Sequence, residues 1–238
     1  MKAVCFDFAG TLFSDRALRD VHLRQLRFVA DAAGVEASDD DLRTAYKRGM
    51  GVAYRAVASG PFYSHRSLFG RALSETAVAL GGSISPEQER EAVDRQYRAT
   101  IETATLRPDA AGAIDELRAD GIHVQVVSNI DDEQLLPMIE RFGLTARLDA
   151  ITSSEAAGSC KPDPEIYRVA LAKAQCDPGE VLFVGDSLQH DIQGPHAAGM
   201  WTALLTADAK PATSDVTPDF VIAALAEVPG VVRRLVTT

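Results

Sequence analysis

The sequence predicts an α/β fold, in which a parallel sheet covered by helices carries an inserted helical domain. Two observations lead to this prediction. From about Arg107 onward, short apolar segments alternate with helical segments, which is the pattern of a parallel sheet with helices on both faces. Between residues 15 and 103 nearly every segment has helical periodicity instead, although the first segment, Ala3 to Phe8, reads as a buried strand. We therefore expect a core domain of residues 1–14 and 104–238 and a helical domain of residues 15–103.

The helical domain begins with "RALRDVHLRQLRFVADAAG", whose apolar side chains fall near one face and which ends at Gly34. A second helix follows Ser38, a plausible N-cap with acidic residues in the first turn after it. Two more helices are expected at Ser67 to Leu80 and Ser85 to Thr103. The glycines in "KRGMG", residues 47 to 51, predict a turn directed toward the core.

The core domain then alternates regularly along the chain. Helices are expected in "PDAAGAIDELRADG", "DDEQLLPMIERFG", "PDPEIYRVALAKAQ" and "DIQGPHAAG", and strands in "HVQVVSN", "LDAITSSE", "EVLFVGDS" and "WTALLT". The segment "DFVIAAL" leading into "VPGVVRRLV" completes the domain, after a mildly polar loop "ADAKPATSD".

Composition excludes several classes of protein. The 238 residues are 46% hydrophobic and 24% charged, which is ordinary for a globular protein. The net charge of −10 and the lack of a basic, aromatic-studded stripe argue against a nucleic-acid partner. The apolar runs are too short to cross a membrane, no secretory signal is recognisable, and three cysteines without a CxxC spacing favour a reducing compartment. We expect a cytoplasmic protein, either a monomer or a homodimer.

Polar residues follow the predicted strands, where the loops of a parallel sheet converge on a ligand site. They are Asp7, Ser128, Asn129, Lys161, Asp186 and Asp191. Each alone could be a solvated loop residue, but their shared place at the strand ends favours a common site.

This set suggests a divalent metal acting on a phosphate. Asp7 and Asp186 supply the hard oxygen ligands that suit Mg²⁺, while Lys161, the Ser128 hydroxyl and the amide of Asn129 could bind phosphate oxygens. An ionised Asp7 could attack phosphorus and form an aspartyl phosphate. No organic cofactor is required.

Four motifs, in order, resemble those of the haloacid dehalogenase (HAD) superfamily: "DFAGT", "VVSN", "CKPDPEIY" and "GDSLQHDIQGPHAAGM". The resemblance covers essentially the whole chain and implies a Rossmann-like core with a helical cap of the C1 type inserted after the first strand. It also implies that Asp7 is the nucleophile, that Ser128 and Asn129 bind phosphate, and that Lys161 balances charge. Mg²⁺ would be held by Asp7, by the backbone carbonyl of Ala9 and by Asp186, with Asp191 in support.

Ala9 departs from the phosphatase members of the superfamily, which have a second Asp at this position as general acid and base. Such a group is typically worth ~10² to 10⁴ in rate. Alanine is instead the pattern of the phosphonoacetaldehyde hydrolases, in which a cap lysine forms a Schiff base with the aldehyde. The only lysine of the insertion is Lys47, so a hydrolase that cleaves a carbon–phosphorus bond is the alternative to a phosphatase acting on a small phosphorylated metabolite.

Two further readings remain. Members that displace halide resemble this chain but lack the acid at Asp186, which argues against dehalogenase chemistry here. A protein that binds a phosphorylated ligand without turning it over would also explain Ala9, although the retained acids and lysine argue against it. Residues of the insertion that could face the substrate are His22, Tyr46, Lys47, Arg48, Arg55, Tyr63, His65 and Arg66.

Overall fold

The computed structural model describes residues 1–14, 18–57, 59–206 and 216–236. The chain forms two compact units, one of Met1–Ser14 with Thr105–Thr238 and one of Asp15–Ala104. The polar loop expected at residues 207 to 215 lies outside the described residues.

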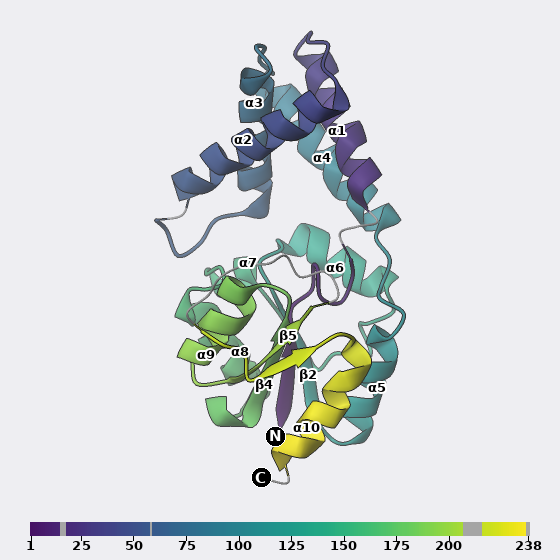
Figure 1. Ribbon diagram of the computed structural model, residues 1–238, viewed down its shortest axis with the longest axis vertical. Coiled ribbons are helices and arrows are strands. Elements are labelled where there is room, and N and C mark those ends of the chain that lie inside the picture. The colour runs from purple at the N-terminus through teal and green to yellow at the C-terminus, as the bar shows by residue number, and fades with distance from the viewer. Residues whose placement is uncertain (15–17, 58, 207–215, 237–238) are drawn as a thin grey trace. The chain divides into compact units, whose positions relative to one another are not determined.

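The first unit is built on a parallel sheet, as the sequence predicted (Figure 1), and the described residues contribute six strands to it. The strands are β1 (Ala3–Phe6), β2 (His123–Ser128), β3 (Ala150–Ser153), β4 (Val181–Gly185), β5 (Trp201–Leu205) and β6 (Phe220–Ile222). Their order across the sheet is β3-β2-β1-β4-β5-β6, so β1 pairs with β2 on one side and with β4 on the other. The first strand of the chain is therefore a central strand, and the residue that follows it is surrounded by loops from its neighbours.

Helices cover both faces of this sheet (Figure 1). They are α5 (Ala110–Ala119), α6 (Asp132–Arg141), α7 (Ser154–Ala157), α8 (Pro164–Ala174), α9 (Gly194–Ala197) and α10 (Val228–Val236). A π-helix, η3 (Leu188–Gln193), and two short 3-10 turns, η2 (Pro178–Glu180) and η4 (Leu225–Glu227), complete the unit. The helix expected from Asp191 onward thus begins three residues earlier, as a π-helix that runs directly into α9.

The buried faces of the strands form the core of this unit. Apolar side chains of β1 and β4 pack with those of α8, where Tyr167 and Phe183 meet edge to face with ring centroids 5.8 Å apart. Strand β1 ends at Phe6, two residues earlier than predicted, because the chain from Phe8 onward closes a turn in which the Leu12 amide donates to the Phe8 carbonyl at 2.9 Å.

The part of the second unit that the structure describes forms four helices, α1 (Arg19–Ala32), α2 (Asp39–Val57), α3 (His65–Ala79) and α4 (Pro86–Thr103). They bury an apolar core that includes Leu26, Leu42 and Leu73. The N-cap predicted at Ser38 is confirmed, because its hydroxyl accepts from the Asp41 amide, and Ser85 at the start of α4 forms a capping box with Gln88.

The turn predicted at "KRGMG" is wrong, because residues 47 to 51 lie inside the continuous helix α2. Gly49 is buried against α3, and a Cβ atom at this position would lie 2.5 Å from the Ala72 carbonyl oxygen and 2.8 Å from Thr76 Oγ1. The glycine therefore permits close packing between two helices, which outweighs its low helix propensity.

Within the described residues, no helix has the length and apolar character needed to cross a membrane.

Candidate functional site

The chain ends of β1 and β4 bring two acidic residues together. Asp7 directly follows β1 and Asp186 directly follows β4, and the pairing of Phe6 with Val184 places these two strand ends side by side. The Asp7 amide donates to the Val184 carbonyl at 2.9 Å, which extends the pairing to Asp7 itself. The sheet thus converts two residues 179 positions apart in the chain into neighbours.

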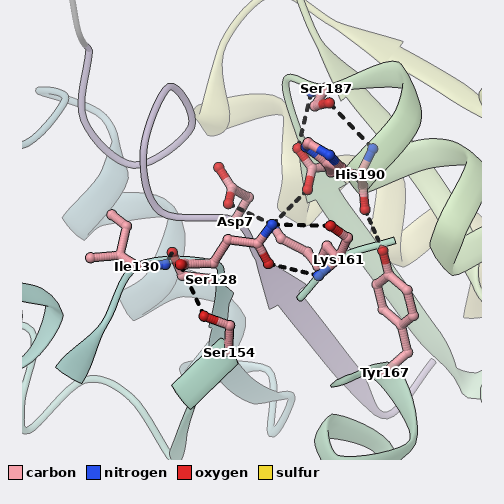
Figure 2. A network of polar contacts seen from close by, with 10 residues as sticks. Asp7, Ser128, Ile130, Ser154, Lys161, Tyr167, Ser187 and His190 are labelled. Carbon is pink, nitrogen blue, oxygen red and sulfur yellow. Dashed lines mark hydrogen bonds and ion pairs between the residues drawn. The ribbon is translucent and has the colours of Figure 1, made fainter. Parts of the chain in front are cut away.

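Lys161 contacts both Asp7 and Asp191, and Figure 2 shows it beside Asp7. Its Nζ is 2.6 Å from Asp7 Oδ1 and 2.7 Å from Asp191 Oδ1, and all three residues are buried. Buried charges require close partners of opposite sign, which this arrangement provides. Two carboxylates share one ammonium group.

Three carboxylates could together hold a metal ion. Oxygen atoms of Asp7, Asp186 and Asp191 all lie within 4.8 Å of one another. Two glycines leave room for them: a Cβ at Gly10 would lie 2.5 Å from Asp186 Oδ2, and one at Gly185 would collide with the Asp191 carboxylate. An all-oxygen donor set of this kind fits Mg²⁺, which usually takes one or two carboxylates and keeps several waters.

The electrostatics of the group follow from its burial. Burial raises the pKa of Asp7 from 3.8 to about 6, although the nearby Lys161 ammonium opposes this rise. For Lys161, burial alone would lower the pKa, but the carboxylates of Asp191 and Asp7 raise it above its usual value. At neutral pH the lysine is therefore charged and Asp7 is mostly ionised.

Ser128 and Asn129 lie at the end of β2, beside β1. The Ser128 hydroxyl accepts a hydrogen bond from the Ile130 amide at 3.3 Å. The side chain of Asn129 joins the main chain of Lys161 at both ends: its Nδ2 donates to the Lys161 carbonyl at 3.0 Å, and its Oδ1 accepts from the Lys161 amide at 2.7 Å. This side chain therefore fixes the loop that carries the lysine.

Hydrogen bonds of three residues missed from the sequence, Tyr167, Ser187 and His190, stabilise the loop after β4 (Figure 2). The Ser187 amide donates to Asp191 Oδ2 at 3.0 Å, and the Tyr167 hydroxyl donates to the His190 carbonyl at 2.5 Å. Burial and the Lys161 ammonium lower the pKa of His190 to about 4, so its imidazole is neutral. Tyr167 ends the motif "CKPDPEIY", but a tyrosine at this position does not by itself predict this contact.

A further residue missed from the sequence, Arg107, contacts the turn that follows Asp7. Its guanidinium Nε and Nη2 donate to the carbonyl oxygens of Thr11 and Gly10, each at 2.8 Å. The sequence does not predict these contacts, because the partners of Arg107 are backbone atoms of residues 96 and 97 positions away.

The other predicted candidates belong to the helical unit. Lys47, Arg48 and Arg55 are exposed on α2, whereas the rest are half-buried, namely His22, Tyr46, Tyr63, His65 and Arg66. Tyr63 stacks on His65 with ring centroids 5.9 Å apart.

Comparison with known proteins identifies the family of this chain. The model of the haloacid dehalogenase-like hydrolase family matches residues 1–199. A ribulose-1,5-bisphosphate 5-phosphatase from Halopiger xanaduensis is 27% identical over 85% of this chain and 83% of its own length. The (S)-2-haloacid dehalogenase 1 of a Pseudomonas species is 25% identical over 99% of this chain and 98% of its own.

A solved structure shares the fold over nearly the whole length. The magnesium-bound HAD hydrolase YfnB from Bacillus subtilis superposes with a TM-score of 0.78 at 22% identity, covering 97% of this chain and 98% of that one. With the family model spanning most of the sequence and the acidic cluster at the carboxyl end of the sheet, the chain belongs to the haloacid dehalogenase-like hydrolases.

Proposed function

We propose that this protein is a Mg²⁺-dependent phosphatase that acts on a small phosphorylated metabolite through an aspartyl phosphate at Asp7. The observation that carries the proposal is Asp186, whose carboxylate lies with those of Asp7 and Asp191 within 4.8 Å. A nucleophilic carboxylate alone would serve dehalogenation equally well. The second acid at the neighbouring strand end favours a metal, and hence a phosphoryl group.

Asp7, Asp186 and the backbone carbonyl of Ala9 would hold the Mg²⁺ ion, with Asp191 in support. When bound, the ion would offset the negative charge of the phosphate and of the carboxylates around it. Lys161 adds one positive charge at the same place, since its Nζ contacts both Asp7 and Asp191. These cations are needed because the chain as a whole carries a net charge of −10.

The residues of the chain would act in two steps. In the first, an Asp7 oxygen attacks phosphorus, an O–P bond forms, and the P–O bond to the leaving group breaks with its electron pair on the departing oxygen. In the second, water attacks phosphorus and returns Asp7 as a carboxylate with release of inorganic phosphate. The Ser128 hydroxyl and the Asn129 amide would hold the non-transferred oxygens.

Ala9 makes this phosphatase unusual. Its methyl group can neither protonate the departing oxygen nor activate the water, so the proton must come from solvent. We therefore expect phosphates with good leaving groups to be turned over faster than alkyl phosphates.

The same alanine favours a second candidate function, the cleavage of a carbon–phosphorus bond through a Schiff base on Lys47. In that reaction the electrons of the broken bond pass into the enamine, so no acid is needed at residue 9. Lys47 is exposed on α2. The second candidate ranks below the first because it depends on this single lysine.

A panel of phosphate esters, acyl phosphates, phosphonates and 2-haloacids, assayed with Mg²⁺ or with EDTA, tests these candidates together. The proposal expects phosphate release that requires Mg²⁺ and is lost in Asp186→Asn. Turnover of a 2-haloacid in EDTA would contradict it. Borohydride trapping of phosphonoacetaldehyde on Lys47, detected by peptide mass spectrometry and absent from Lys47→Arg, would establish the second candidate instead.

A further inference from the structure

Arg107 contacts three successive residues of the turn that follows Asp7. Its Nε donates to the Thr11 carbonyl, its Nη2 to the Gly10 carbonyl and its own amide to the Leu12 carbonyl, each at 2.8 Å. Arg107 lies in the segment by which the chain returns to the first unit, which resumes at Thr105. Arg107 thus stabilises a turn whose residues lie almost a hundred positions earlier in the sequence.

The remaining hydrogen bonds of this turn show why the contact matters. The Gly10 amide donates to the Phe13 carbonyl at 2.9 Å, which fixes the peptide plane whose carbonyl belongs to Ala9. The next two peptide planes in the chain are those whose carbonyls Arg107 holds. Each residue has only two soft dihedral angles, φ and ψ, so fixing the peptide planes on both sides of Gly10 fixes the direction of the Ala9 carbonyl.

Gly10 also touches the acidic cluster. Its φ of +87° is in the left-handed region, and the space that a Cβ would occupy is taken by the Asp186 carboxylate. The turn therefore connects the Arg107 guanidinium with Asp186. Rotation of the Gly10 peptide would move the surface against which this carboxylate packs.

We propose that Arg107 is a positioning residue for the metal site, holding residues 9 to 12 so that the Ala9 carbonyl and the Asp186 carboxylate are preset beside Asp7. The inference rests on the proposed function, because it assumes that a divalent cation binds there. An arginine suits this task, since its planar fork donates to two carbonyls at once, whereas a lysine has a single nitrogen.

The test is Mg²⁺ titration by calorimetry of the wild type, Arg107→Met, Arg107→Lys and a matched control, Arg147→Met. Arg147 is half-buried on the same unit and also donates to a backbone carbonyl, that of Gly143 at 2.8 Å, and to Asp115, two partners outside the site. We expect Arg107→Met to bind Mg²⁺ ~10 to 100-fold more weakly, as is typical when a partner of a metal ligand is lost. Arg107→Lys should fall between, and Arg147→Met should match the wild type.

Hydrogen exchange of the metal-free proteins provides a second measurement, the exchange rate of the backbone amides in the turn. The amides of residues 10 to 13 should exchange faster in both Arg107 variants than in the control, even where melting temperatures agree. If Arg107→Met does not fold, Arg107→Lys decides by the same two measurements.

The outcomes separate the two proposals. Wild-type protein that binds no Mg²⁺ would overturn the proposed function and this inference with it. Wild-type binding that persists undiminished in the Arg107 variants would overturn the inference alone.

Discussion

Replacing Asp7 with asparagine should make the metal-free protein more stable, although it removes the proposed nucleophile. Asp7 is buried, and burial destabilises its charged form by more than the attraction of the Lys161 ammonium stabilises it. Asparagine has nearly the same shape and no charge, so it avoids this cost. Lys161 keeps its contact with Asp191 at 2.7 Å.

The size of the effect follows from the pKa. A carboxyl whose pKa rises from 3.8 to about 6 on folding costs ~3 kcal/mol of stability once it is ionised in both states. Because the native state holds the proton more tightly than the unfolded state, this group's contribution falls as the pH rises from about 4 to 6 and is constant above that. The advantage of Asp7→Asn should therefore be ~3 kcal/mol at pH 8 and about half of that at pH 5.

Urea unfolding in EDTA, followed by tryptophan fluorescence, measures this difference. The single tryptophan, Trp201, lies in β5, so its signal reports the unit that contains Asp7. At pH 8 the variant should also melt ~6 to 12 °C higher, given the usual ~2 to 4 °C per kcal/mol for a chain of this size. Asp115→Asn, an exposed surface change, serves as the control and should shift stability by less than ~0.5 kcal/mol at every pH.

An Asp7→Asn protein that is less stable than the wild type at pH 8 would refute this reasoning. So would a difference that does not change between pH 5 and 8, because it would show that the charge of Asp7 is not its source. Added Mg²⁺ should stabilise the wild type more than Asp7→Asn, and so reduce the difference between their free energies of unfolding.

Two other predictions concern single positions. Ala9→Asp should raise turnover of an alkyl phosphate by up to ~10², and that of p-nitrophenyl phosphate far less, because only the alkoxide needs an acid; an equal gain on both substrates would rule out that role for residue 9. Gly49→Ala should destabilise the helical unit by ~1 to 3 kcal/mol through its clash with the Ala72 carbonyl and Thr76, whereas Gly51→Ala should stabilise it by up to ~1 kcal/mol. Thermal melts by circular dichroism compare the two, and a loss of stability in both would mean that helix packing at Gly49 is not the distinguishing cause.

The polar ends of the strands could be located from the sequence because a parallel sheet brings them to one edge. Asp7, Ser128 and Asp186 each stand at the last residue of an apolar segment or just after it, and the sheet confirms that placement. The alternation of strands and helices that predicted the sheet depends on local periodicity alone.

Contacts made through the main chain could not be foreseen in this way. The Arg107 guanidinium donates to two backbone carbonyls, and the Asn129 side chain pairs with the backbone of Lys161. Neither contact corresponds to a recognisable pattern of residue types or spacing in the sequence. The turn predicted at Gly49 was wrong for a related reason, because a glycine that permits close helix packing cannot be distinguished in a sequence from a glycine that forms a turn. Only the position of α3 distinguishes them.

The central place of β1 also affects how the chain can fold as it is synthesised. Residues 3 to 6 pair with residues 123 to 126 and 181 to 184, so β1 is synthesised before both of the strands with which it pairs. The helical unit, by contrast, is one continuous stretch of chain and can form early, since contacts between residues near in sequence close smaller loops. A nascent chain that stops short of Val181 therefore leaves one edge of β1 unpaired, and it is the edge on which the Asp7 amide pairs with the Val184 carbonyl in the folded protein.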